Sequence, residues 1–180
     1  MNKRNKYMKI SIITITFNSA KTLQRALASV QGQTYREIEH ILVDGASTDG
    51  TRDMIAAYAK THPNVRWVSE KDNGIYDALN KGIAMATGEV VGFLHSDDVL
   101  FAPDSIEHIA AVFESEQADV VYGDLQYCRG NRVVRHWKSN DFNLCALKYG
   151  WMPPHPTVYV RRAVYEQVGP YDDWFRISAD

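Results

Sequence analysis

The chain has 180 residues, of which 45% are hydrophobic and 23% are charged, as in one soluble globular domain. Its formal net charge of -2 excludes the global basic field that attracts nucleic acid, and no nucleic-acid partner is expected. Cys128 and Cys145 have neither CxxC spacing nor a nearby His pair, so both are interpreted as reduced thiols.

The N-terminal residues 1–8 are interpreted as a tail, because they are basic but contain no apolar signal core. The longest apolar stretch, Ile10 to Phe17, is too short to span a bilayer and is interrupted by Ser and Thr. We therefore expect a cytoplasmic protein with one domain over residues 9–180. The chain stops at the polar end Ile177–Asp180 with no helix after it, which suggests a domain truncated at its C-terminus.

The first half of the chain alternates predicted strands with predicted helices. Apolar, mostly β-branched runs predict buried strands at 9–17, 38–43, 65–69 and 90–94. The first helix is expected to be capped by Asn18 or Ser19 and to stop at Gly32, and two more are expected at 51–60 and 75–86. Helical spacing marks their core-facing residues as Leu23, Ala26, Leu27 and Val30; Met54, Ile55, Tyr58 and Ala59; and Ile75, Leu79, Ile83 and Ala86.

The second half begins with a helix in which Pro103 occupies the first turn and Ile106, Ile109, Ala110 and Phe113 face the core. A single strand is predicted over 118–128, and Arg129-Gly-Asn131 turns it into a hairpin with 133–137. Alternating strands and helices imply an α/β fold with βαβ units and a mostly parallel sheet. The remaining elements are a short helix at 142–149, a non-helical loop at 150–156, a short strand at 157–160 and a short helix at 163–168.

Acidic residues follow several of the predicted strands. Asp44, Asp72 with Glu70 nearby, and the pair Asp97-Asp98 would line one crevice if the first, second and fourth strands are neighbours. A single Asp after a strand is more often a turn or cap residue. Two adjacent carboxylates, however, repel each other unless a cation lies between them. Their oxygen atoms suit Mg²⁺ or Mn²⁺, with ligand phosphates and water completing the shell.

Three common phosphate-binding or catalytic motifs are absent from the sequence. It contains no G-x-x-x-x-G-K-[ST], which disfavours a P-loop ATPase. No G-x-G-x-x-G follows the first strand, which weakens a dinucleotide-binding interpretation. No G-x-S-x-G is present either, so a serine hydrolase would lack its nucleophile.

Seven segments, in this order, resemble those of family 2 glycosyltransferases with the GT-A fold: Ser11–Ser19, Leu42–Thr51, Ser69–Gly82, Ala86–Glu89, His95–Asp98, Pro154–Thr157 and Ile177–Asp180. The closest similarity is to bacterial enzymes of exopolysaccharide, O-antigen and colanic acid synthesis. The resemblance implies a Rossmann-like three-layer α/β sandwich. It also implies an inverting, metal-dependent transfer from a nucleotide-diphosphate sugar, expected to be UDP-linked, to a glycan or lipid-linked acceptor. Peripheral association with the inner face of the cytoplasmic membrane is compatible with that role.

The resemblance also implies the residues that bind the donor. Thr16, Asn18 and Asp44 would hold the nucleotide, with the Asp44 carboxylate accepting the N3–H of uracil. Glu70 and Asp72 would flank the nucleotide, and Asn80 and Lys81 would lie near the diphosphate or sugar. For Lys81, a solvated helix lysine is an equally good interpretation. Asp97 would contact the ribose or the metal, and Asp98 would bind the metal.

The chain departs from the family pattern at two positions. His95 replaces the first Asp of a D-x-D-D motif, as a metal ligand or as a neutral residue packed at the crevice wall. Asp180 matches the general base of an E-D motif, in which Ala179 replaces the Glu. His155 and Trp151 are expected in the acceptor pocket, although a rigid loop and hydrophobic packing would explain them as well.

Two other functions were weighed against the glycosyltransferase. A chain that ends at its base could be a non-catalytic nucleotide-sugar binding module or a fragment of an enzyme. A sugar-phosphate nucleotidyltransferase would need a G-x-G-x-R loop after the first strand, and Phe17-Asn-Ser-Ala20 does not provide one.

Overall fold

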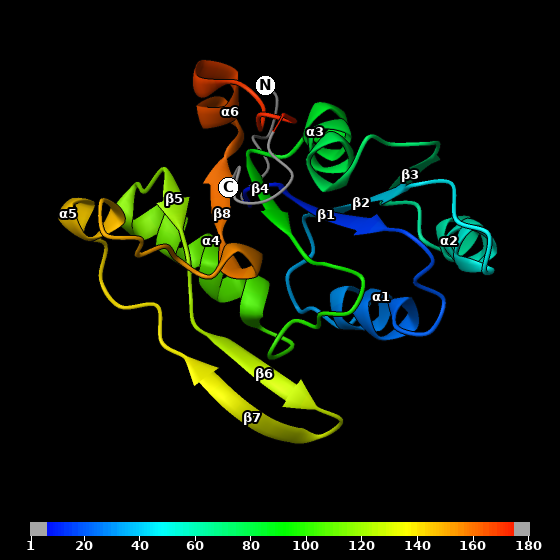
Figure 1. The fold of residues 1–180 in the computed structure, drawn as a ribbon, viewed down its shortest axis with the longest axis horizontal. Coiled ribbons are helices and arrows are strands. Elements are labelled where there is room, and N and C mark those ends of the chain that lie inside the picture. Colours follow the sequence, from blue (N-terminus) through cyan, green and yellow to red (C-terminus); the bar gives the residue numbers. More distant parts are fainter. Residues whose placement is uncertain (1–6, 175–180) are drawn as a thin grey trace.

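The computed structural model describes residues 7–174, which form a six-stranded sheet of order β3-β2-β1-β4-β8-β5 and a separate two-stranded sheet (Figure 1). Strands β1 to β4 run parallel to one another, whereas β8 runs antiparallel to both of its neighbours, β4 and β5. The strands are β1 Ile10–Thr16, β2 Ile38–Asp44, β3 Val65–Ser69, β4 Val90–Phe93, β5 Val120–Val121, β6 Leu125–Arg129, β7 Arg132–Trp137 and β8 Tyr159–Arg161.

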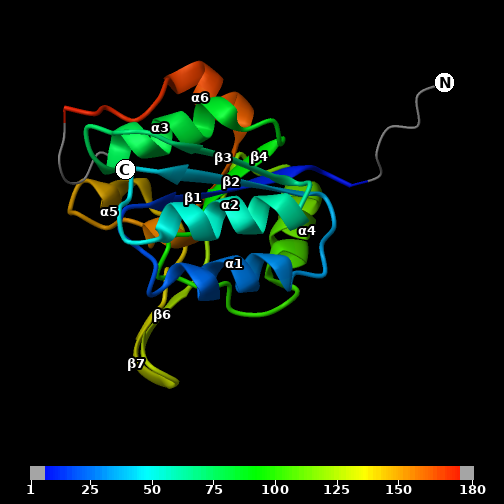
Figure 2. The same ribbon diagram turned by 90° about the vertical axis from the view of Figure 1, so that its right-hand side faces the viewer.

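Helices cover both faces of the large sheet, which makes three layers (Figure 2). One face packs against α1, α2 and α4, and the other against α3 and α6. The helices are α1 Leu23–Gln31, α2 Thr51–Thr61, α3 Ile75–Met85, α4 Ser105–Glu116, α5 Leu144–Leu147, the 3₁₀ turn η1 His155–Thr157, and α6 Arg162–Val168. The predicted three-layer α/β sandwich with a mostly parallel central sheet is therefore confirmed.

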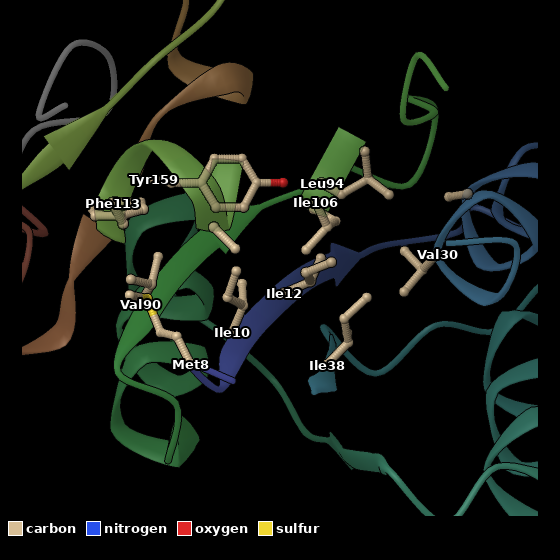
Figure 3. Close-up of a cluster of buried hydrophobic side chains, with 12 residues drawn as sticks. Met8, Ile10, Ile12, Val30, Ile38, Val90, Leu94, Ile106, Phe113 and Tyr159 are labelled. Carbon is tan, nitrogen blue, oxygen red and sulfur yellow. The ribbon is translucent and has the colours of Figure 1, made fainter. Parts of the chain in front are cut away.

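The sheet interior explains why the first strands are almost continuously apolar. Ile10 and Ile12 of β1 point into a cluster with α1 and α4 (Figure 3), while Ile13 points to the opposite face and packs near α3. A strand covered on both sides has no solvent face, so it needs no polar alternation. Where β4 meets β8, the absence of a side chain at Gly92 admits the Tyr159 ring, which would lie 2.1 Å from an added Cβ.

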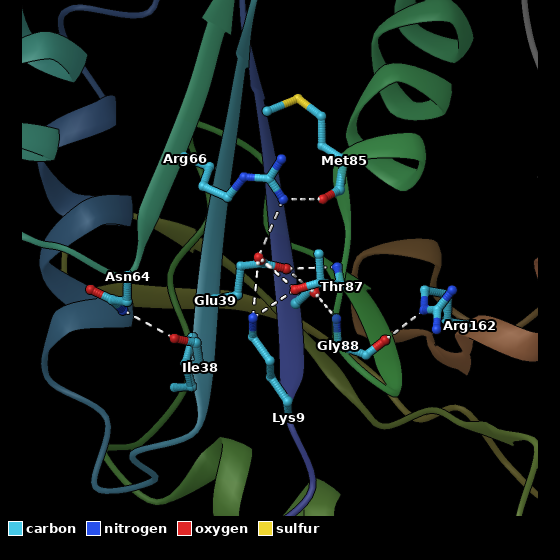
Figure 4. A network of polar contacts seen from close by, with 10 residues as sticks. Lys9, Ile38, Glu39, Asn64, Arg66, Met85, Thr87, Gly88 and Arg162 are labelled. Carbon is cyan, nitrogen blue, oxygen red and sulfur yellow. Dashed lines mark hydrogen bonds and ion pairs between the residues drawn. The ribbon is translucent and has the colours of Figure 1, made fainter.

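A buried carboxylate ties the amino ends of the strands together (Figure 4). Glu39 of β2 accepts hydrogen bonds from the Ser11 hydroxyl at 2.7 Å and from the Thr87 backbone N–H at 2.9 Å. It also forms ion pairs with Lys9 at 3.3 Å and Arg66 at 3.5 Å. Burial raises the pKa of Glu39, but these hydrogen bonds and the Lys9 charge outweigh burial and lower it to about 2. The network lies at the amino ends of the strands, whereas the acidic loops lie at their carboxyl ends.

Strands β2 and β4 both pair with β1, which meets the condition for one crevice lined by their loops, but several local predictions are wrong. Residues 118–128 form two strands in different sheets, β5 and β6, because Gly123 and Asp124 separate them. Helix α1 begins after Thr22, which makes no side-chain cap bond, so neither Asn18 nor Ser19 is its cap. Pro103 precedes α4, and the segment 150–156 runs into the turn η1 instead of remaining a loop.

The stripe predicted for α3 is confirmed at Leu79, Ile83 and Ala86 but is wrong at Ile75. Ile75 is 46% exposed, whereas Tyr76 is 7% exposed and packs in the core with Leu79. Within residues 7–174, no helix combines the length and apolar character that crossing a bilayer requires.

Candidate functional site

Asp44, the last residue of β2, is the most completely bonded acidic residue of the site. Its two carboxylate oxygens accept four hydrogen bonds, from the Thr16 hydroxyl at 2.9 Å, the Ser69 hydroxyl at 2.7 Å, and the hydroxyl and backbone N–H of Ser47. Burial raises the pKa of Asp44, but bonds from Ser47, Ser69 and Thr16 outweigh it and hold the pKa below its usual value. Asp44 is therefore an ionised anchor that joins the carboxyl ends of β1, β2 and β3.

The loops after β1, β2 and β4 are bonded to one another. The backbone N–H of Asn18 donates to the Ser47 hydroxyl at 2.8 Å, and its side-chain oxygen accepts from the Thr48 N–H at 3.0 Å. The Ser96 hydroxyl donates to the Ser19 hydroxyl at 2.9 Å, which joins the loop after β4 to the same group. Asn18 adopts a positive φ of 50°, a conformation that Asn tolerates better than most residues. These contacts join the loops after β1, β2 and β4 into one continuous rim at the carboxyl ends of the strands.

Asp72 is brought against the loop after β2 by a glycine. A Cβ at Gly45 would lie 2.4 Å from the Asp72 carboxylate and 3.3 Å from the Phe17 ring, so only glycine leaves room for this approach. The other Asp72 oxygen accepts from the Gly74 N–H at 3.1 Å. The Asp72 carboxylate therefore lies against the residue that follows Asp44 in the chain, as expected for two groups that flank one ligand.

Lys81 lies in a local acidic environment on α3. Its Nζ is 3.1 Å from Glu70 and 3.4 Å from Asp77, and it donates to the Lys71 carbonyl at 2.9 Å. Partial burial lowers the pKa of Lys81, but the bonds to Glu70 and Asp77 outweigh burial and raise it. An incoming phosphate would have to compete with two carboxylates for this ammonium group.

The Asn80 side chain bonds to the backbone of a residue far along the chain. Its Nδ2 donates to the Tyr171 carbonyl at 2.8 Å, and its Oδ1 accepts from the Tyr171 N–H at 2.9 Å. Both hydrogen bonds of the Asn80 amide are therefore made to protein backbone. Asn80 therefore holds the segment that leads toward the C-terminus against α3, a contact that no sequence motif predicts.

Asp97 and Asp98 form the turn after β4 and have no Lys or Arg partner among the described residues. Asp97 is exposed and Asp98 is half-buried. Burial and the neighbouring Asp97 charge raise the pKa of Asp98, while His95 opposes them. Among residues 7–174 no group of three or more His, Cys, Asp or Glu side chains is spaced to hold a metal. Two carboxylates are nevertheless the protein share of many Mg²⁺ sites, where phosphates and water complete the shell.

An aromatic group lies beside the β4 loop, and sequence reasoning missed part of it. The ring centroid of His155 is 5.4 Å from Phe93 and 5.7 Å from His95, and Tyr171 packs against the same group. The antiparallel pairing of β8 with β4 explains this, because it returns residues 155–157 to the carboxyl end of β4. Tyr171 carries no motif, so only its contacts reveal it.

Trp151 lies farther out, in a separate aromatic group with Tyr122 and Phe142, each ring centroid 6.1 Å away. An open cavity of about 480 Å³ adjoins Tyr122 and is lined by Tyr122, Asp124, Lys138, Ser139, Asn140 and Asp141. The structure thus separates the two residues predicted for the acceptor pocket, with His155 near the acidic rim and Trp151 near this cavity. Asp180 and Ala179 lie outside the described residues.

Comparison with known proteins shows the family to which the chain belongs. A model of the family "Glycosyl transferase family 2" matches residues 11–177, nearly the whole chain. The chain belongs to glycosyl transferase family 2. A PGL/p-HBAD biosynthesis glycosyltransferase of Mycobacterium bovis is 37% identical to this family member over 175 residues, covering 94% of this chain and 66% of the relative.

Solved structures agree on the fold of this family 2 chain. Staphylococcus aureus TarS (residues 1–349) superposes with a TM-score of 0.78 at 24% identity, covering 96% of this chain and 52% of TarS. Its complex with UDP-GlcNAc gives a TM-score of 0.74 at 26% identity, covering 89% and 47%. The mannosyltransferase PcManGT of Pyrobaculum calidifontis, in complex with GDP-Man and Mn²⁺, gives 0.73 at 22%, covering 93% and 48%. The chain thus spans about half to two thirds of these proteins.

Proposed function

We propose that this chain carries the donor-binding and metal-binding part of an inverting glycosyltransferase. It takes a sugar from a nucleotide-diphosphate donor, with UDP as the expected nucleotide, and transfers it to a glycan or lipid-linked acceptor in cell-surface polysaccharide synthesis. The proposal places the reaction in the cytoplasm, at the inner face of the membrane. The names of the relatives favour an enzyme over a non-catalytic binding module.

The observation that carries the proposal is the joining of acidic loops at one edge of the sheet. The Asp72 carboxylate lies against Gly45, the residue after Asp44, and the loop that bears Asp97 and Asp98 is bonded to the loop after β1 through Ser96 and Ser19. A site for a nucleotide diphosphate needs one region for the base and ribose and another for the charged phosphates. The loops at the carboxyl ends of parallel strands can form both regions, and ligands of α/β sheets bind there.

In this proposal Thr16, Asn18 and the Asp44 rim orient the nucleotide, and Glu70 and Asp72 flank it. Since all four Asp44 bonds are made within the protein, a uracil N3–H would replace one hydroxyl donor when the nucleotide binds. Lys81 is proposed to exchange part of its pairing with Glu70 for the diphosphate. Asn80 is proposed to act through its bonds to Tyr171.

Asp97 and Asp98 would hold the divalent cation, either Mg²⁺ or Mn²⁺. The pair fits a cation because the two charges are adjacent, Asp98 is half-buried, and no described Lys or Arg neutralises them. When bound, such an ion neutralises charge on the departing diphosphate. Among the solved structures, PcManGT is described in complex with Mn²⁺.

The acceptor side of the proposal rests on Asp180, His155 and Trp151. An inverting transfer needs one base to take the acceptor hydroxyl proton, help typically worth about 10²–10⁴ in rate. The sequence pattern assigns this role to Asp180. His155 would border the acceptor near the β4 loop, and Trp151 offers a sugar-stacking face beside the open cavity.

A donor panel tests the proposal. Thermal unfolding is measured with UDP, UDP-sugars and GDP-sugars, each with Mn²⁺, with Mg²⁺ and with a chelator. A true donor at 100 times its dissociation constant should stabilise the fold by about 2.7 kcal/mol. Asp98→Asn should remove the metal-dependent part of that gain, and exposed Asp119→Asn serves as the control. Absence of any nucleotide effect, or an Asp98→Asn protein that behaves like wild type, contradicts the proposal.

A second measurement tests the base. Asp180→Asn should abolish release of nucleoside diphosphate in the presence of acceptor, while donor affinity changes by no more than a few fold. Equal loss of binding and turnover would instead assign Asp180 to donor binding or to folding.

A further inference from the structure

The hairpin formed by β6 and β7 stands apart from the rest of the protein. The two strands make a sheet of their own, and in both Figure 1 and Figure 2 they extend well beyond the three-layer body. Every residue from Tyr127 to His136 is exposed. Neither face of the hairpin is covered by another element within residues 7–174.

The hairpin is strongly basic although the chain as a whole is not. Between Leu125 and Lys138 the sequence has Arg129, Arg132, Arg135 and Lys138 but no Asp or Glu. Arg129 and Arg132 stand directly opposite each other in the ladder, a like-charge pairing that destabilises a hairpin by itself. None of the three arginines forms an ion pair with a residue in the range 7–174. No described carboxylate therefore neutralises these arginines.

Apolar and aromatic side chains lie among these cations. Val134 is 57% exposed, and Tyr127 and Val133 are also exposed. The Arg135 guanidinium lies 5.4 Å from the Tyr127 ring centroid and 5.7 Å from that of Trp137. These contacts place the guanidinium over the face of the hairpin that carries both rings.

We propose that the β6–β7 hairpin docks the protein on an anionic phospholipid bilayer. Tyr and Trp favour the headgroup level of a membrane, and each Arg near an anionic surface adds attraction. Val134, which shares a face with the Arg129–Arg132 pair, supplies the short apolar insertion that a purely electrostatic nucleic-acid site does not need. The net charge of -2 gives the chain as a whole no attraction to an anionic surface, so binding would depend on local basic segments such as this hairpin.

This inference deepens the membrane part of the proposed function, since it names the element that brings the site to a lipid-linked acceptor. It is tested by binding alone. A failure of lipid binding therefore leaves donor binding and transfer untouched, and a failure of transfer leaves the hairpin proposal standing.

The experiment is co-sedimentation with vesicles of phosphatidylcholine alone or with phosphatidylglycerol, at low and high salt. Wild type is compared with Arg129→Ser/Arg132→Ser/Arg135→Ser and with the control Arg25→Ser/Arg52→Ser/Lys60→Ser, which removes the same charge from exposed positions on α1 and α2. The hairpin triple variant should partition on the order of 100-fold more weakly to anionic vesicles. The control should bind within about threefold of wild type, because its substituted residues lie off the docking face.

A second variant separates insertion from charge. Val134→Ser should weaken binding at high salt as well as at low salt, since it removes the apolar contact, whereas the further loss in Val134→Asp should be seen mainly at low salt, where its repulsion is unscreened. Circular dichroism confirms that each variant is folded. Equal binding to neutral vesicles, equal loss in both triple variants, or capture of single-stranded RNA without vesicle binding would overturn the proposal.

Discussion

The side-chain amide of Asn80 forms two hydrogen bonds, of 2.8 and 2.9 Å, with the backbone carbonyl and N–H of Tyr171. The two bonds resemble the pair that a neighbouring strand would form with the backbone of Tyr171. They come from helix α3, which also borders the proposed donor site. The bonds connect the first half of the chain to the segment that continues toward Asp180. A residue predicted to touch the diphosphate therefore has a second task that its position in the sequence concealed.

Asn80→Ala is expected to lower turnover more than donor affinity, because it removes both bonds to Tyr171 and leaves buried backbone groups unsatisfied. The unfolding free energy should fall by about 1–3 kcal/mol. Denaturant unfolding and nucleotide titration measure the two effects separately. Gln24→Ala, an exposed helical amide on α1, should change neither. A large loss of donor affinity at unchanged stability would return Asn80 to direct donor contact.

Asp44→Asn should destabilise the protein and weaken nucleotide binding together. The new amide would place an N–H group where Ser69 or Ser47 now donates, so two donors would face each other. Loss of hydrogen bonds to a buried charge costs about 1.5–3 kcal/mol each. Urea unfolding with and without UDP reads out both effects. If stability is unchanged, the four bonds seen around Asp44 do not anchor the rim.

Gly45→Ala is a test of the contact between the second and third loops. The added methyl would overlap the Asp72 carboxylate at 2.4 Å, so the loop must move and donor affinity should fall about tenfold or more, a loss of about 1.4 kcal/mol. Gly123→Ala is the matched control, because nothing lies within 4 Å of a Cβ there and its φ is not positive. Calorimetric titration with the best donor from the panel compares the two. Similar affinities for both variants would refute the proposed role of Asp72.

Glu39→Gln addresses stability against pH, away from the site. The pKa of Glu39 is about 2 in the folded protein against an ordinary value of 4.5. A lowered pKa means that Glu39 stabilises the fold fully above about pH 4.5 and that this contribution is lost as the pH falls toward 2. At pH 7 the variant should be less stable by about 2–3 kcal/mol, and the difference from wild type should shrink in acid. Exposed Glu89→Gln should show neither effect in the same denaturation series.

The sequence predicted the parallel half of the fold well, for a physical reason. Residues of β1 and β2 are buried on both faces, so their apolar runs are long and leave no competing pattern. The strand order did not follow from the sequence, where the adjacency of the first, second and fourth strands was only a condition for one acidic crevice; the structure supplies it. Membership of the family was likewise readable, because seven motifs occur in order along the chain.

The errors fall where tertiary contacts override local pattern. Tyr76 was left out of the predicted stripe of α3, yet it is more buried than Ile75, since its ring packs near Tyr171. The run 118–128 looked like one strand, but its ends pair with different partners. Asn18 and Ser19 looked like caps, but they bond across to other loops. No pattern within a short window contains such information.

The placement of β8 between β4 and β5 has a consequence for how the protein folds. Residues up to Phe93 can assemble the four parallel strands, yet β4 then exposes a row of unpaired backbone groups until Tyr159–Arg161 arrives. Open strand edges of this kind invite pairing with other chains. During synthesis, the strand that leads into Asp97 and Asp98 thus gains its second neighbour later than β1 and β2 do. Shortened chains that stop before residue 159 are expected to aggregate, whereas chains that include β8 cover this side of β4.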